Sequence, residues 1–277
     1  DHRDLHSFPT RRSSDLTGAA GVHLGDAIYL SANSARFVMR AARHRPLPAW
    51  QGFLLSLLFL AIILAWLFRS SFAAEQVLFS NDGPLGALMT EAIRVPGSFT
   101  GYWPDLYWVG TNGGSATVGV TYLLMWLLGP LGFANFYGPL TLLILGGCAW
   151  IYFRSLNLSL GLCFVGALAA ALNMNFFSNT CWGLGTRSLT LAAAFLALAA
   201  LNEQRMGRPW LNAMLAGLAV GLGVMEGADN GAIFSLFVAA YVLFQSLANP
   251  PTLRQKLLAC SRLVLVAGMA AFMAAQA

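Results

Sequence analysis

The sequence predicts an all-α protein, a bundle of helices that crosses a membrane several times. The first reason is a series of long uncharged runs, most of them close to the roughly 20 apolar residues that a helix needs to cross a bilayer. The second is composition, because 57% of the residues are hydrophobic and only 10% are charged. The third is that Lys and Arg lie beside the apolar runs, which argues against a nucleic-acid partner and indicates membrane lipids instead.

Six full spans and a truncated seventh are predicted from these runs. The full spans cover 50–68, 134–153, 158–177, 188–202, 209–225 and 231–249. The seventh begins at Leu263 and is cut off by the end of the sequence, so we expect the chain to be a piece of a longer protein. Residues 50–277 would then be a partial transmembrane domain with an outer loop at 69–114.

Residues 1–49 precede the predicted bundle and differ from it in composition. Residues 6–16 read HSFPTRRSSDL and resemble the translation of a sequencing-library adapter, so we expect 1–16 to be an artefact. Residues 17–49 form a basic segment that carries four arginines between Arg36 and Arg45. We expect this segment to lie in the cytoplasm beside the membrane, because Lys and Arg are enriched in cytoplasmic loops.

The segment 115–133 is the apolar run that does not fit a simple crossing. If it crossed, the basic residues that follow later spans, such as Arg154 and Arg254, would face outward against the positive-inside rule. If the chain instead turns back near Gly129-Pro130, every later loop obeys that rule. We therefore predict a re-entrant or interfacial helix at 115–133, whose broken backbone needs a protein-lined cavity on the outer face.

Carboxylates gather on the outer side under this topology. Asp82 and Asp105 belong to the first outer loop, and Glu226 and Asp229 belong to the last outer turn. Acidic groups beside a membrane are costly unless they are paired, hydrated or used in a site. The outer face is therefore where we expect the chemistry.

Three stretches give the sequence a resemblance to the GT-C superfamily of membrane glycosyltransferases, and most to its YfhO-like branch. They are FSNDGPLG at 79–86, LLGPLG at 127–132 and YFRSLNLSLGLCFVGALAAALN at 152–173. The shared layout is a first span, a large outer loop with an early acidic residue, interfacial helices and a row of closely spaced spans. The paired acidic signature of several branches is absent, since Gly83 follows Asp82.

The resemblance implies transfer of a sugar from a polyprenyl-phosphate donor to an acceptor, on the outer face of the bacterial inner (cytoplasmic) membrane. Asp82 matches the carboxylate that would take the proton of the acceptor hydroxyl. Asp82 also has a second interpretation as a turn residue, because Asn-Asp-Gly-Pro is strong turn chemistry. The two roles are both open at this point.

Five further residues are candidates for binding the substrate. The departing lipid phosphate needs a cation or a metal to stabilise its charge, and Arg187 and Arg94 are the outer cations. Asp105, Tyr102 and Trp103 complete the set in the outer loop. The alternatives are that Arg187 is an interfacial anchor and that the aromatic residues form an interfacial belt.

Glu226 and Asp229 are the candidate metal ligands. They lie at i and i+3 in the stretch MEGADNG and would share a face on one helical turn. Together with Asp82 they could hold a divalent cation, Mg²⁺ or Mn²⁺. The alternative is a hydrated loop between two spans.

A transporter or flippase-like protein without catalysis is the alternative function. Such a protein is expected to carry charged residues and broken helices near the middle of the bilayer. The acidic residues of this chain lie near the predicted ends of spans instead, which favours a reaction at the outer surface.

Overall fold

The computed structural model describes residues 48–73, 76, 119–202, 208–248 and 252–275. All regular structure in these residues is helical, which confirms the predicted fold class. Five helices are long and apolar enough to cross a membrane, or up to six if one bent pair counts as a single span. The expectations for 1–16, for nearly all of 17–49 and for most of the loop 69–114 lie outside the described residues.

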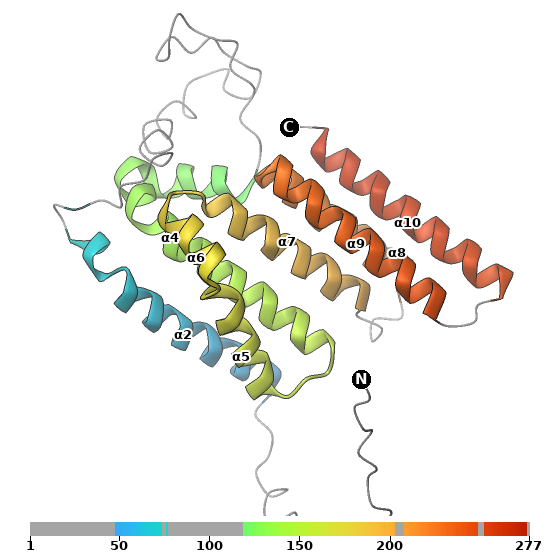
Figure 1. Cartoon of the computed structure of the whole chain (residues 1–277), viewed down its shortest axis with the longest axis horizontal. Helices are drawn as coiled ribbons and strands as arrows, with labels where there is room; N and C mark the ends of the chain where they lie inside the picture. The colour runs from blue at the N-terminus through green and yellow to red at the C-terminus, as the bar shows by residue number, and fades with distance from the viewer. Residues whose placement is uncertain (1–47, 74–75, 77–118, 203–207, 249–251, 276–277) are drawn as a thin grey trace, which may run out of the picture. The chain divides into compact units, whose positions relative to one another are not determined.

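The described helices follow the predicted spans closely, apart from the two changes reported below. In chain order they are α2 (Ala49–Leu67), the short 3₁₀ helix η1 (Arg69–Phe72), α4 (Val120–Ser155), α5 (Leu160–Ala171), α6 (Met174–Cys181), α7 (Gly185–Asn202), α8 (Pro209–Glu226), α9 (Ala228–Ala248) and α10 (Leu253–Ala274). Helix α7 packs against both α4 and α8, with α2 and α5 on the α4 side and α9 and α10 on the α8 side (Figure 1).

The bundle has two ends, which we name after one residue at each. The Glu226 end contains η1, the start of α4, α6, the start of α7 and the junction of α8 and α9 (Figure 1). The Arg154 end contains the start of α2, the junction of α4 and α5, the end of α7 and the start of α8 (Figure 1). Contacts far apart in sequence define each end: Phe68 meets Phe177 at the first, and Asn202 meets Ser155 at the second.

The break predicted near Gly129-Pro130 is present inside α4. Gly129 has φ 66° and ψ 179°, a conformation that is essentially restricted to glycine. Pro130 follows it and lacks the N–H that a continuous helix would use, so it suits the start of a new helix. Residues 120–128 lie across the Glu226 end of the bundle, and the rest of α4 then runs through the bundle (Figure 1). We call residues 120–128 the crossing helix because they cross this end of the bundle, not the membrane.

The predicted span 158–177 is not a single helix. Helix α5 ends at Ala171 and α6 begins at Met174, and the two are bent by 46°. Asn173 causes the restart, because its side chain accepts a hydrogen bond from the N–H of Asn175 at 3.1 Å and so caps α6. The hydropathy pattern missed this cap because apolar residues continue on both sides of it.

The seventh span begins earlier than predicted, at Leu253 instead of Leu263. Its first part includes Lys256 and Arg262, which lower the hydropathy of the segment. Lys and Arg are nevertheless good helix formers, so the helix starts before the apolar run does. The error arose because the apolar run was taken as the boundary of the helix.

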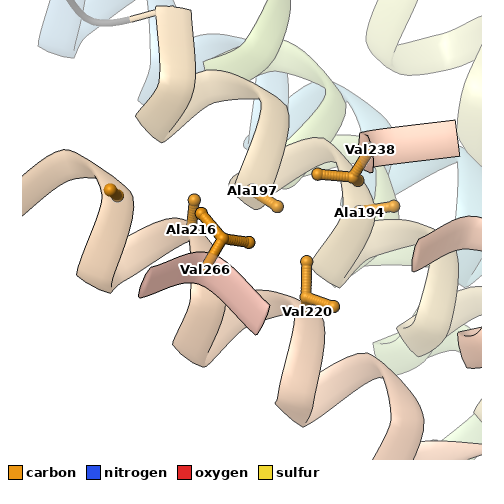
Figure 2. Packing of buried hydrophobic residues seen from close by; sticks show 7 residues of the cluster. Ala194, Ala197, Ala216, Val220, Val238 and Val266 are labelled. Carbon is orange, nitrogen blue, oxygen red and sulfur yellow. The ribbon is translucent and has the colours of Figure 1, made fainter. Parts of the chain in front are cut away.

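Small residues bring α7, α8 and α10 close together. Figure 2 shows a cluster where residues of α7, α8, α9 and α10 meet, and it labels Ala194, Ala197, Ala216, Val220, Val238 and Val266. A Cβ atom added at Gly217 would lie 2.6 Å from the Cβ of Met269, and one added at Gly221 would lie 2.5 Å from the Cβ of Met273. These two glycines therefore allow α8 to contact the backbone of α10 directly.

Candidate functional site

Glu226 is a buried carboxylate at the last residue of α8, with 7% of its surface exposed. Its side chain reaches the start of the crossing helix. Its oxygens accept hydrogen bonds from the backbone N–H of Val120 and from the backbone N–H of Thr121 at 3.2 Å. The Thr121 hydroxyl donates a further bond of 2.6 Å. Both carboxylate oxygens are therefore engaged by protein donors.

The crossing helix needs such a partner for its first N–H groups. These groups have no acceptor within the helix, and Gly119, at the N-cap position, has no side chain to supply one. The N-terminus of a helix also carries a partial positive charge that favours a nearby carboxylate. Glu226 thus serves as an N-cap supplied by a helix that lies 105 residues further along the chain.

Tyr137 extends this network into the second part of α4. Its hydroxyl lies 2.8 Å from the hydroxyl oxygen of Thr121. The single proton of the Thr121 hydroxyl points to Glu226, so Tyr137 is the donor in this pair. The chain of bonds from Tyr137 through Thr121 to Glu226 joins the crossing helix, the rest of α4 and α8.

An apolar cluster packs around Tyr137 and the crossing helix, next to this hydrogen-bond network. The rings of Phe133 and Tyr137 stack with their centroids 4.3 Å apart, and both rings are buried together with Leu189. The crossing helix contributes the residues on its inner face, Val120, Leu124, Met125 and Leu128. The position of the crossing helix is therefore fixed by apolar packing as well as by hydrogen bonds.

Arg187 lies in the first turn of α7 and is half-buried. Its Nη1 donates to the Asn179 side-chain oxygen at 2.8 Å, and the Asn179 amide donates to the Asn175 side chain at 2.9 Å. Gly183 makes this contact possible, because its φ of 87° ends α6 and turns the chain back toward Asn179. One such contact does not saturate a guanidinium group, which carries five N–H donors.

Arg187 and Glu226 lie at the same end of the bundle, as predicted. Thr190 donates its hydroxyl proton to the carbonyl of Arg187 at 2.7 Å. Gly227 follows Glu226, and a Cβ added to it would lie 3.2 Å from the Thr190 methyl group. The start of α7 therefore packs against the end of α8.

Asp229 does not share a helical turn with Glu226, so this part of the prediction is wrong. Helix α8 ends at Glu226, Gly227 is extended with φ −169° and ψ 100°, and Asp229 belongs to the first turn of α9. Asp229 is exposed whereas Glu226 is buried. The residues that the structure describes contain no group of three His, Cys, Asp or Glu side chains suited to a metal ion. The predicted cation site also involves Asp82, which is not among them, and so stays a prediction.

Five predicted residues of the outer loop lie outside the described part of the chain: Asp82, Arg94, Tyr102, Trp103 and Asp105. The residues that flank the loop are described, and both flanks attach to the Glu226 end. Phe72 stacks on Phe136 with centroids 5.1 Å apart before the loop, and Thr121 meets Glu226 after it. The loop therefore leaves and rejoins the bundle at the end that holds Arg187.

Thr121 and Tyr137 are the members of this site that the sequence did not reveal. Each is a lone polar residue in an apolar run, and hydropathy alone does not indicate a functional role for such a residue.

In comparisons with known proteins, no family model, curated protein or solved structure matches the chain.

Proposed function

We propose that the chain belongs to a membrane glycosyltransferase that transfers a sugar from a polyprenyl-phosphate-linked donor to an acceptor. The observation that carries the proposal is the meeting of three features at the Glu226 end. These are both attachments of the loop that contains Asp82, the half-buried Arg187 and the crossing helix. A lipid-linked substrate needs a site of this kind, because its sugar and phosphate lie at the membrane surface while its chain stays in the bilayer.

Each residue has a separate task in the proposed reaction. The Asp82 carboxylate takes the proton of the acceptor hydroxyl as the hydroxyl oxygen attacks the anomeric carbon. The bond from the anomeric carbon to the phosphate oxygen breaks, and Arg187 stabilises the charge on the departing lipid phosphate. Asn179 orients the guanidinium through the 2.8 Å contact. A Mg²⁺ or Mn²⁺ ion held with help from Asp229 is a further part of the proposal, and it would share the task of Arg187.

The proposed topology places the Glu226 end outside and the Arg154 end in the cytoplasm of a bacterium. Arg154 lies in the last turn of α4, Arg208 is the N-cap of α8 and Lys256 lies in the first turn of α10, so all three belong to the Arg154 end, as the positive-inside rule requires of a cytoplasmic face. The crossing helix then lies at the outer interface. In this arrangement α2, the second part of α4, the α5–α6 pair, α7, α8, α9 and α10 are the spans.

One observation favours the alternative function, a transporter or flippase-like protein. The α5–α6 pair is a broken helix, and broken helices line the binding sites of many transporters. Helix α5 has 12 residues and α6 has eight, so the break at Asn173 lies within the length of the pair. The acidic residues that the structure describes, Glu226 and Asp229, lie instead at the end of α8 and the start of α9, which suits a surface reaction better than a site at the middle of the bilayer.

A transfer assay on the chain in proteoliposomes separates the two functions. Donors would be polyprenyl phosphates that carry different labelled sugars, with a mixture of envelope glycans as acceptors. We expect label to move from the lipid to an acceptor with wild-type protein and to stay on the lipid with Asp82→Asn. Movement of the intact labelled lipid between leaflets, with no transfer and no effect of Asp82→Asn, would support the transporter.

A further inference from the structure

We infer that Glu226 is a positioning residue, which pins the crossing helix and with it the point where the loop carrying Asp82 rejoins the bundle. The inference rests on the proposed function for the identity of the site that is positioned. The contact that holds the crossing helix, which we call the pin, rests on the structure alone. A carboxylate with 7% exposure has both oxygens occupied by donors from the first two residues of the crossing helix.

Gly119 shows how closely the carboxylate fits the start of the helix. A Cβ atom added at Gly119 would lie 2.5 Å from the Glu226 Oε1 atom. The backbone of Gly119 has φ −128°, which any residue can adopt, so glycine is needed here for space and not for conformation. The lack of a side chain at Gly119 therefore leaves the space that the Glu226 carboxylate occupies.

The pin is needed because the crossing helix is joined to the rest of α4 through a weak point. Gly129 interrupts the helical backbone there with φ 66° and ψ 179°, so two separate helices meet at this residue. Among the residues that the structure describes, none covers the outer face of the helix, where Leu123, Trp126 and Leu127 are each at least half exposed. The hydrogen bonds that join Thr121 to Glu226 and to Tyr137 are therefore the polar contacts that hold the start of the crossing helix in place.

Spin-label distance measurements on the full chain in nanodiscs test the pin without any activity assay. In a background without the natural cysteines, labels replace the exposed Leu127 on the crossing helix and the exposed Ile233 on α9. We expect a single narrow distance in the wild type and loss of that narrow distance in Glu226→Ala. Glu226→Gln should retain it, because the amide oxygen still accepts from the N–H groups of Val120 and Thr121.

Two further variants distinguish loss of the Glu226 contacts from a general failure of the protein to fold. Gly119→Ala keeps Glu226 but displaces its carboxylate, so it should also broaden the distance, whereas the exposed Asp229→Asn should not. A narrow distance in both Glu226→Ala and Gly119→Ala would overturn the inference. Broadening of the wild-type distance by EDTA would also overturn it, because Glu226 would then act through a bound metal. Since none of these readouts depends on sugar transfer, a failed transfer assay leaves the pin testable.

Discussion

The two ends of the bundle satisfy their polar groups in different ways. At the Arg154 end the turn after α4 has a partner close in sequence, because Arg154 donates to the carbonyl of Leu158 at 3.0 Å, and the link to a distant helix is the 3.4 Å bond from the Asn202 amide to the Ser155 hydroxyl. Asn157, with φ 60°, ends α4 there in the left-handed conformation that commonly ends helices. At the Glu226 end the start of the crossing helix is capped by a side chain 105 residues away.

This difference indicates which end can transmit a change. A helix end that is satisfied by its own neighbours can be altered without moving another helix. The start of the crossing helix depends on α8, and through Thr121 it also depends on Tyr137. We therefore expect substitutions at the Glu226 end to affect function and stability more than matched substitutions at the Arg154 end.

The largest expected effect is an all-or-none difference between the two ends of the bundle in their labelling from outside the cell. In a background without the natural cysteines, Asp229→Cys should react with a membrane-impermeant maleimide in intact cells, and Leu156→Cys should react only after permeabilisation. The reason is the concentration of basic residues at the Arg154 end. The reverse pattern of labelling would overturn the proposed topology and the outward-facing site.

Asp82→Asn should produce the largest loss of activity, a fall in the transfer rate of about 100-fold or more, which is the usual size for a general base. Asparagine keeps the ability to form a turn, so the loop should be retained. The measurement is the single-turnover rate with labelled lipid donor. An unchanged rate would assign Asp82 to the turn alone.

Arg187→Ala should weaken transfer by about 10- to 100-fold, which corresponds to a charged hydrogen bond worth roughly 1.5–3 kcal/mol. Arg187→Lys should restore part of the activity, since lysine keeps the charge but not the planar fork of donors. The matched control is Arg208→Ala, an exposed arginine at the Arg154 end, which should leave the rate unchanged. Equal losses at both arginines would mean that Arg187 only anchors the protein at the interface.

Gly185→Ala should give the smallest effect, a destabilisation of about 1–3 kcal/mol through overpacking. A Cβ at this position would lie 2.7 Å from Tyr137 Cε1 and 2.9 Å from the Thr141 hydroxyl oxygen. Both atoms belong to buried side chains that cannot easily move away.

Gly161→Ala is the control at the Arg154 end, where a Cβ would meet no atom within 4 Å. Alanine is favoured over glycine in helices, so this change should be neutral or stabilise by up to about 1 kcal/mol. Thermal unfolding in detergent measures both variants. A Gly185→Ala protein as stable as the Gly161→Ala protein would remove the distinction between the two ends.

Much of the fold was predictable because its signals are local. Apolar runs of sufficient length predicted α2, the second part of α4, α7 and α8 with small shifts at their ends. The charge pattern, with Gly129-Pro130, predicted the break that the structure shows inside α4, and the return of the segment to the outer face stays a prediction. These features depend on hydropathy, backbone conformation and charge, each of which a short stretch of sequence contains.

The errors came from side chains whose role depends on their surroundings. Asn173 breaks a predicted span because it caps α6, and Gly227 separates Glu226 from Asp229. In both cases a continuous pattern of residues concealed a change in backbone direction. Periodicity alone does not distinguish a polar residue on a helix from one that ends it.

The sequence by itself determined the helical class, the order of the spans and the end of the bundle to which Glu226 and Arg187 belong. Only the tertiary structure decided what those residues touch. Glu226 was expected to help bind a cation, and in the structure it accepts hydrogen bonds from the N–H groups of a distant helix, while Arg187 donates to Asn179. The physical reason is that a buried charge needs donors placed in three dimensions, and the packing of α8 against α7 and of Phe133 and Tyr137 under the crossing helix provides them.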